Sequence, residues 1–150
     1  MPRPKKPATA LDFVMKSLAA REQTAFQLRE KLARKEFPAA EIDAALEKVV
    51  ELGFLSDERW LENWLRERAA LRPAGKRQLL FLARRAGISE ELFEKGWEAA
   101  ELEESQLARA AAESFLRRKG GADREKLARH LAGRGFGWGE IREVLGEQGL

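Results

Sequence analysis

Two stretches of this chain, far apart in the sequence, repeat the same spacing of large apolar residues. QLREKLARKEFPAAEIDAAL begins at Gln27, and KLARHLAGRGFGWGEIREVL begins at Lys126. A middle copy, QLLFLARRAGISEELFEKGW, begins at Gln78 and has one residue fewer in its turn. Apolar steps of helical size on both sides of a turn predict a helix–turn–helix unit that occurs three times. The equivalent positions are Leu28, Leu32, Phe37, Ile42 and Leu46; Leu79, Ala83, Ile88 and Leu92; and Leu127, Leu131, Phe136, Ile141 and Leu145.

The composition favours helices along the whole chain. Tyrosine is absent, β-branched residues are few, and Ala, Leu, Glu, Arg and Lys dominate. A further helix is expected in front of each pair, at residues 9–20, 57–70 and 103–118. The predicted fold is all-α, with three tandem three-helix repeats. Because a unit of this size buries little surface alone, the repeats are expected to stack into an elongated, curved, right-handed or solenoid-like array.

Specific residues mark the ends of the predicted helices. Thr24 followed by Gln27 is typical of a capping box, and Pro38 stands where a first helical residue belongs. These marks divide the chain into a flexible basic tail (1–8) and three repeats (9–54, 55–101 and 102–150). The other predicted N-caps are Ser56-Asp57, Ser89 and Asp123, and the predicted helix stops are Gly53, Gly87 and Gly120-Gly121.

The stretch GRGFGWGEI, from Gly133, raises the question of a phosphate-binding loop, because its four glycines stand at alternate positions. A dinucleotide-binding loop follows a strand, and a P-loop carries Lys followed by Ser or Thr; neither feature is present. In the repeat, Gly135-Phe136 takes the place of Glu36-Phe37 and of Gly87-Ile88. We interpret the stretch as a tight turn whose glycines permit left-handed backbone, with Phe136 inserted into the core.

The net charge is only +3, but basic residues are concentrated between Arg68 and Ser89, where no acid occurs. On a helical wheel, arginines surround Phe81 on the side opposite Leu79. Two interpretations stay open: a contact patch for nucleic acid or an acidic protein surface, or Phe81 packed on a neighbouring repeat with solvated arginines. In the third repeat, Lys126 and Arg129 either extend the basic face or are simply solvated. The candidate binding residues are Arg72, Lys76, Arg77, Phe81, Arg84, Arg85, Lys126 and Arg129.

The other aromatic and charged residues have structural interpretations. Trp60 and Trp64, four residues apart, are predicted to lie in the core, and Trp97 to pack inside the middle repeat. Trp138 is predicted to be partly exposed and is a candidate partner contact. Asp57-Glu58 begins a helix and is interpreted as cap and dipole partners rather than a catalytic pair. Arg117-Arg118-Lys119 ends a helix, where cations favour the negative end of the helix dipole.

Absent residue types exclude several kinds of protein. Without cysteine there is no disulfide, thiol nucleophile or thiolate metal site, and one histidine, His130, excludes a multi-histidine site. No apolar run approaches the roughly 18 residues of a membrane span, and the basic start lacks the apolar stretch of a signal peptide. No acids converge on a nucleophile. The expectation is a cytoplasmic protein without cofactor or metal that is not an enzyme.

Four segments together resemble the RecX family of bacterial recombination regulators. They are REQTAFQLREKLARKEF from Arg21, LGFLSDERW from Leu52, PAGKRQLLFLARRAGISEEL from Pro73 and LAGRGFGWGEIREVL from Leu131. The likeness covers about residues 9–149, and GFLSDERW is its most specific element. The chain departs from the family where Trp60 replaces a phenylalanine or tyrosine and where Ala83 replaces a leucine-like core residue.

The resemblance implies an all-α, cytoplasmic regulator of DNA repair, recombination and the SOS response, without enzyme activity or cofactor. Proteins of this kind bind the RecA recombinase, especially its filament on single-stranded DNA, and inhibit ATP hydrolysis and strand exchange. The expected protein is a monomer that binds single-stranded DNA weakly, without sequence specificity, and has no membrane partner. Two alternatives stay open: a helix-turn-helix transcriptional regulator, which would distinguish DNA sequences, and a helical-repeat adaptor with no preference for recombinase.

Overall fold

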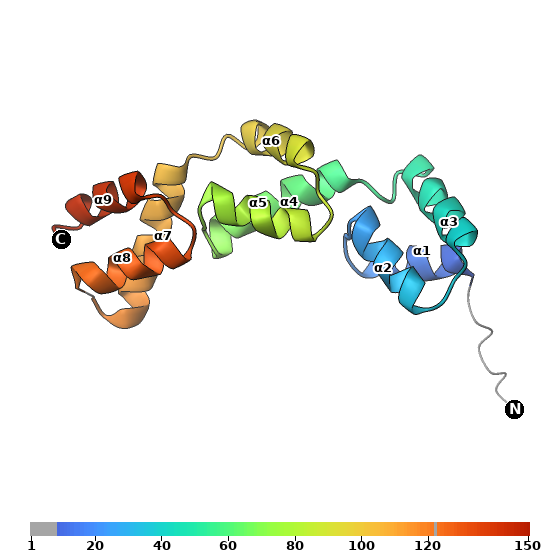
Figure 1. Ribbon diagram of the computed structural model, residues 1–150, viewed down its shortest axis with the longest axis horizontal. Coiled ribbons are helices and arrows are strands. Elements are labelled where there is room, and N and C mark those ends of the chain that lie inside the picture. The colour runs from blue at the N-terminus through green and yellow to red at the C-terminus, as the bar shows by residue number, and fades with distance from the viewer. Residues whose placement is uncertain (1–8, 122) are drawn as a thin grey trace, which may run out of the picture. The chain divides into compact units, whose positions relative to one another are not determined.

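The computed structural model describes residues 9–121 and 123–150; the tail predicted to be flexible, residues 1–8, lies outside them. The described residues form nine α-helices and no strand, which confirms the all-α prediction. The helices expected at residues 9–20, 57–70 and 103–118 correspond to α1, α4 and α7. The helices are α1 (Ala10–Ala20), α2 (Ala25–Arg34), α3 (Ala39–Glu51), α4 (Asp57–Leu71), α5 (Lys76–Arg85), α6 (Glu90–Ala99), α7 (Glu104–Lys119), α8 (Arg124–Gly133) and α9 (Trp138–Glu147) (Figure 1).

The chain separates into two compact units. The first contains the residues up to Trp60 together with Ala86–Ile88, and the second contains Leu61–Arg85 and Ser89–Leu150. The boundary between the units therefore falls inside α4. The division into three repeats at residues 54/55 and 101/102, and the stacking of those repeats into an array, stay predictions.

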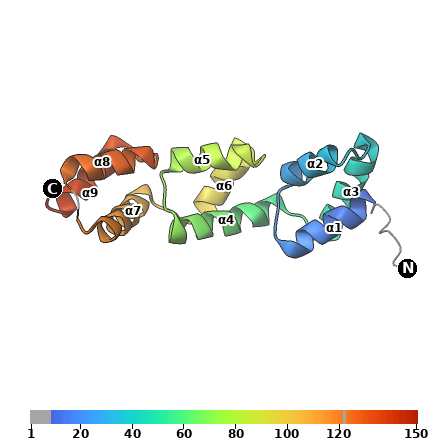
Figure 2. The same cartoon turned by 90° about the horizontal axis from the view of Figure 1, so that it is seen from below.

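In the first unit, α3 packs against both α1 and α2 (Figure 2). In the second unit, α7, α8 and α9 pack against one another, and α5 packs against α6. The repeated apolar spacing identifies the residues that these contacts bury. All of the equivalent positions are buried except Phe37 and Leu92, which are half-buried, so the predicted core positions are largely confirmed. Ala83, the small residue of the middle copy, is fully buried, so its place in the core is kept.

The prediction that Trp60 and Trp64 are core residues is wrong. Both side chains are half-buried, because α4 turns the adjacent Leu61 and Leu65 into the core instead. On Trp64, the guanidinium of Arg68 lies 5.3 Å from the ring centroid, in cation–π geometry.

The helix ends largely follow the predicted signals. The capping box of Thr24 and Gln27 is present, and Ser89 and Asp123 each accept a hydrogen bond from a backbone N–H of the helix that follows. Pro38 is the N-cap rather than the first helical residue, because its backbone is extended (ψ 147°). At the start of α4, Ser56 caps the helix by accepting from the Arg59 N–H at 3.1 Å.

Asp57 caps a different helix from the one it begins. Its Oδ1 accepts a hydrogen bond from the backbone N–H of Ala25, the first residue of α2, at 2.9 Å. Glu104, the first residue of α7, stands in the same relation to Lys76, the first residue of α5, from whose backbone it accepts a hydrogen bond. An acid at the start of one helix therefore supplies the negative charge at the N-terminus of another.

Among the four glycines of GRGFGWGEI, only Gly135 uses the left-handed region, with φ 88°. Gly137 is an N-cap with φ −78°, and Gly133 and Gly139 lie within helices. The left-handed backbone is confirmed for Gly135 but is wrong for the other three, and of these only Gly137 lies in the turn between α8 and α9. Phe136 is 4% exposed, as predicted for a side chain inserted into the core.

The turns before α6 and α9 each accept a hydrogen bond, through a backbone carbonyl, from the residue that stands just before another helix. In the first unit, Thr24 Oγ1 donates a buried hydrogen bond of 2.6 Å to the Ala86 carbonyl. In the second unit, the Gly75 N–H donates to the Arg134 carbonyl at 2.8 Å. Thr24 and Gly75 each stand directly before the second helix of a repeat, α2 and α5. The repeated sequence therefore produces a repeated contact between a helix start and a turn.

Replacing Thr24 with alanine is expected to lower the free energy of unfolding by about 2–3 kcal/mol, since both the cap and the buried bond to Ala86 are lost. Thr24→Ser keeps the hydroxyl and is expected to cost less than half as much. Urea denaturation followed by circular dichroism measures both variants. Equal losses for alanine and serine would show that the hydroxyl contributes nothing.

Candidate nucleic-acid and partner interface

One face of α5 is formed by Arg77, Phe81, Arg84 and Arg85, which follow i, i+4, i+7 and i+8; we call it the α5 face. All four side chains are exposed, and Phe81 is 60% exposed. The opposite side of the helix carries Leu79 and Ala83, both buried. The pattern predicted from the helical wheel is therefore confirmed as geometry, with the aromatic ring among the arginines rather than inside the core.

The charges of the α5 face have no acidic partners among the described residues. None of Arg77, Arg84 and Arg85 takes part in an ion pair there. The Arg85 guanidinium lies 5.8 Å from the Phe81 ring centroid, within cation–π range. Arg84 and Arg85 also stand in the last turn of α5, where their positive charges interact favourably with the negative end of the helix dipole. The face thus presents free guanidinium groups beside an exposed ring.

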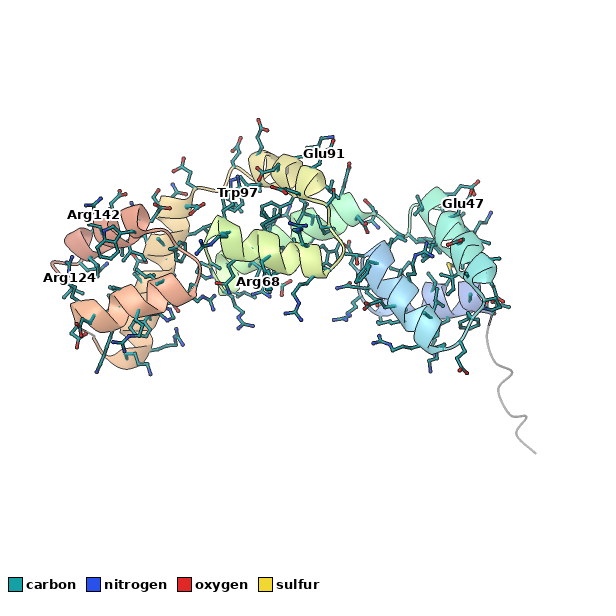
Figure 3. The ribbon with its side chains drawn as sticks, in the orientation of Figure 1. Glu47, Arg68, Glu91, Trp97, Arg124 and Arg142 are labelled. Carbon is teal, nitrogen blue, oxygen red and sulfur yellow. The ribbon has the colours of Figure 1, made fainter. Side chains whose placement is uncertain are left out.

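Lys76 does not belong to the α5 face, because its side chain points toward α6. Its Nζ is 2.9 Å from Glu94 Oε2 and 5.5 Å from the centroid of the Trp97 ring. Trp97, labelled in Figure 3, is half-buried between these helices and stacks on Phe93 with ring centroids 6.0 Å apart. Trp97 therefore contacts Phe93 and Lys76 of the middle helices, as predicted, but is only half-buried like Trp60 and Trp64, and Lys76 is held by structural partners.

Glu104 lies close to the same lysine. Burial raises the pKa of the Glu104 carboxyl, the neighbouring Glu140 raises it further, and the charge of Lys76 opposes both effects. The charge of Lys76 therefore offsets the negative charges of Glu94 on α6 and Glu104 on α7. A lysine engaged in this way is less available to an external anion than the arginines of the α5 face.

The remaining candidates lie around α7 and α8. Arg72, just after α4, lines a recess together with Arg118 and Arg134. Lys126 and Arg129 are exposed on α8 and line a second recess. The eight candidate residues are therefore divided between the α5 face, the contact of Lys76 with α6, and the surroundings of α8.

Sequence reasoning missed the contributions of Arg118, His130 and Arg134 to these recesses. Arg118 was interpreted only as a cation at a helix end, and Arg134 was hidden in the glycine-rich turn. Arg118 lies in the last turn of α7, whereas His130 and Arg134 lie in the last turn and at the C-cap of α8, so their common signal is a basic residue at a helix end. Only the packing of α7 and α8 shows that they line the same recess.

Exposed apolar side chains provide a further surface. Trp138, in the first turn of α9, is 57% exposed, as predicted. In the first unit, Val50, Leu52 and Phe54, at the end of α3 and in the turn after it, are each about half exposed. These three residues were not among the predicted contact residues; apolar side chains exposed close together are typical of a protein contact.

The described residues contain no group of three or more His, Asp or Glu side chains arranged to hold a metal ion. None of the described helices combines the length and hydrophobicity that a membrane crossing requires.

These features define an all-α protein of repeated helix–turn–helix units with an unpaired basic face, and known proteins share its fold. Residues 10–48 match the first three-helix domain of RecX. The chain is 31% identical over 137 residues to the regulatory protein RecX of Chlorobium phaeobacteroides (strain BS1), with 91% of each chain covered. It is also 31% identical over 140 residues to that of Pelodictyon phaeoclathratiforme (strain DSM 5477 / BU-1), covering 91% of this chain and 86% of the relative.

A solved structure shares the fold. The crystal structure of RecX from Lactobacillus salivarius superposes with a TM-score of 0.76 at 16% identity, covering 92% of this chain and 93% of that one. The chain belongs to the RecX family, and its relatives from Chlorobium phaeobacteroides and Pelodictyon phaeoclathratiforme are called regulatory proteins.

Proposed function

We propose that this protein binds a RecA-type recombinase, including its filament on single-stranded DNA, and inhibits the ATP hydrolysis and strand exchange of that filament. Membership of a family of regulatory proteins supports a regulatory role. The observation that carries the proposal is the α5 face, where three unpaired arginines surround an exposed phenylalanine. Arg and aromatic side chains, Phe among them, are enriched in protein interfaces relative to the rest of the surface.

The proposed mechanism needs no chemistry from the regulator itself. A recombinase filament displays both protein surface and DNA phosphates, and the α5 face offers groups suited to each. Guanidinium groups pair with carboxylates or phosphates, while the Phe81 ring is removed from water. A protein held there inhibits by occupying surface that the filament needs for turnover. We propose that it acts as a monomer in the cytoplasm.

The test is ATP hydrolysis by the host recombinase on single-stranded DNA, with this protein titrated in. Inhibition near stoichiometric ratios is expected. Absence of inhibition at every ratio, with the protein folded, would overturn the proposal. Under the alternative of a transcriptional regulator, the protein would instead distinguish duplex sequences in a binding assay.

Replacing Arg77, Arg84 and Arg85 together with alanine is expected to weaken filament binding roughly 10- to 100-fold, because several interface contacts are removed at once. Fluorescence anisotropy with labelled protein measures the affinity at two salt concentrations. The salt dependence of binding is also expected to fall.

The matched control for this variant removes three exposed cations from other helices, Lys16, Lys48 and Arg142, and changes the net charge equally. It is expected to keep most of the affinity. If the two triple variants bind alike, net charge rather than the α5 face decides binding.

A further inference from the structure

Two cavities in the second unit meet at His130. The first, of about 310 Å³, is lined by Arg72, Arg118 and Arg134 beside Ser114. The second, of about 490 Å³, is lined by Lys119, Lys126 and Arg129 beside Phe115. His130 lines both cavities, and no acidic residue is among the described residues that line either one. Residues of α7 and α8 line both cavities, and these two helices pack against each other (Figure 1).

The positive charge of the first cavity is fixed in place but not neutralised. Arg134 Nε and Nη2 donate to the Pro73 carbonyl oxygen at 3.2 and 3.0 Å, which holds the guanidinium and leaves its other donors free. In the described part of the chain, Arg72, Arg118 and Arg134 form no ion pair with any acid. Burial lowers the pKa of Arg134, and the charges of Arg72, Arg68 and Arg118 lower it further.

An aromatic pair lies at the junction of the two cavities. The His130 ring stacks on Phe115, with centroids 4.2 Å apart and planes inclined by 17°. Phe115 is 9% exposed and lines only the second cavity, whereas the half-buried His130 lines both. A flat ring with cations on both sides is the arrangement with which proteins hold single strands: the backbone follows the charges and a base stacks on the ring.

We propose that these two cavities form a track for single-stranded DNA, with backbone phosphates held by Arg72, Arg118 and Arg134 on one side and by Lys119, Lys126 and Arg129 on the other. His130 is the stacking platform between them. We call this surface the α7–α8 track. That the bound strand is single-stranded DNA rests on the proposed function. The α7–α8 track would bind this DNA at a site separate from the α5 face.

The observations favour a nucleic acid over an acidic protein segment. An acidic segment needs only cations, whereas the track also places an aromatic ring between two groups of cations. Guanidinium donors match phosphate oxygens two at a time. Both cavities fall within the range of volumes, about 300–1,000 Å³, that hold a small ligand, so each has room for part of one nucleotide.

Because His130 titrates, the affinity of the track for DNA is expected to depend on pH and to fall as pH rises. In the free protein, burial lowers the pKa of His130, and the charges of Arg134, Arg118 and Lys119 lower it further. Arg72, Lys126 and Arg129 line the same cavities and add positive charge. A bound phosphate favours the imidazolium, so the pKa rises on binding. Affinity is therefore highest below the pKa of the free protein and falls as pH rises toward the pKa of the complex.

The experiment uses the full chain without an affinity tag, because His130 is then the only histidine and its ring signals in NMR need no assignment. The ring carbon–proton shifts are followed from acid to neutral pH, with and without oligo-dT of about 12 nucleotides. A rise in the pKa of His130 and a ring-current shift on DNA addition are expected. Unchanged His130 signals at saturating DNA would overturn the proposal.

Two variants each remove a cation from one cavity. Arg118→Gln and Lys126→Gln are expected to weaken oligo-dT binding about 3- to 10-fold and to reduce the slope of log affinity against log salt by about 0.7 each. The control is Arg142→Gln on α9, which is labelled in Figure 3. It changes the charge equally in the same unit, and Arg142 lines neither cavity. Arg118→Gln and Lys126→Gln values equal to those of the control would contradict the track.

A third variant separates stacking from titration. His130→Phe keeps a ring on Phe115 but removes the proton, so binding is expected to persist while its dependence on pH in this range disappears. Polyglutamate replaces oligo-dT in a parallel arm; an equal shift of His130 with polyglutamate would overturn the assignment to nucleic acid. These measurements contain no recombinase. A negative result would therefore contradict the α7–α8 track alone, and the proposed inhibition of ATP hydrolysis is tested separately by the recombinase assay.

Discussion

Gly75→Ala is expected to lower the free energy of unfolding by about 2–3 kcal/mol. Gly75 is buried in front of α5, and its N–H donates to the Arg134 carbonyl at 2.8 Å. A Cβ at this position would stand 2.1 Å from the Gly135 carbonyl oxygen, which is backbone and cannot turn aside. The helix start must therefore withdraw from the turn, and the hydrogen bond is weakened with it. The urea midpoint of unfolding measures the loss.

Gly139→Ala is the matched control for this substitution. Gly139 lies inside α9, and a Cβ there meets no atom within 4 Å. Alanine favours the helix over glycine by about 0.5–1 kcal/mol, so this variant is expected to be slightly more stable than the natural sequence. If Gly75→Ala proved as stable as Gly139→Ala, α5 would not meet the turn at Gly135 in the folded protein.

Phe93→Ala is expected to cost about 3–5 kcal/mol, the largest effect of a single substitution proposed for this protein. Phe93 is fully buried in α6 and stacks on Trp97. Its removal loses the transfer free energy of the ring and leaves a cavity beneath Trp97. Denaturation followed by tryptophan fluorescence measures the loss, and the emission of the natural protein gives the reference.

Phe81→Ala, in the same unit, is the control for Phe93→Ala. Because Phe81 is 60% exposed, its loss is expected to change the free energy of unfolding by no more than about 0.5 kcal/mol. The same variant is expected to weaken filament binding. A large loss of stability in Phe81→Ala would show that this ring belongs to the core rather than to the α5 face.

The helices and most core positions follow from the sequence, because they depend on local periodicity. Leu28 and Leu32, and Leu127 and Leu131, are buried because residues three or four apart share one face of a helix. The same local logic places Ser89 and Asp123 at helix starts. It was less reliable for Trp60 and Trp64, where neighbouring leucines compete for the same side of α4.

Contacts between distant helix ends could not be obtained from local patterns. Gln78 stands at the same place in α5 as Gln27 does in α2, where its side chain completes a capping box. In α5 the N–H of Gly75 instead donates to Arg134, and the buried Gln78 Oε1 has no partner among the described residues. The starts of α2 and α5 both carry glutamine at the same position. Their hydrogen bonds differ because the Gly75 N–H donates to Arg134, 59 residues further along the chain.

The sequence by itself determined an all-α chain, its repeated core spacing and the α5 face, since each depends on residues less than a few helical turns apart. The tertiary structure alone decided that Asp57 caps α2, that Gly75 meets the turn at Gly135, and that Arg72, Arg118 and Arg134 line one cavity with His130. Those arrangements depend on how helices pack, and packing joins residues whose separation in the chain carries no periodic signal.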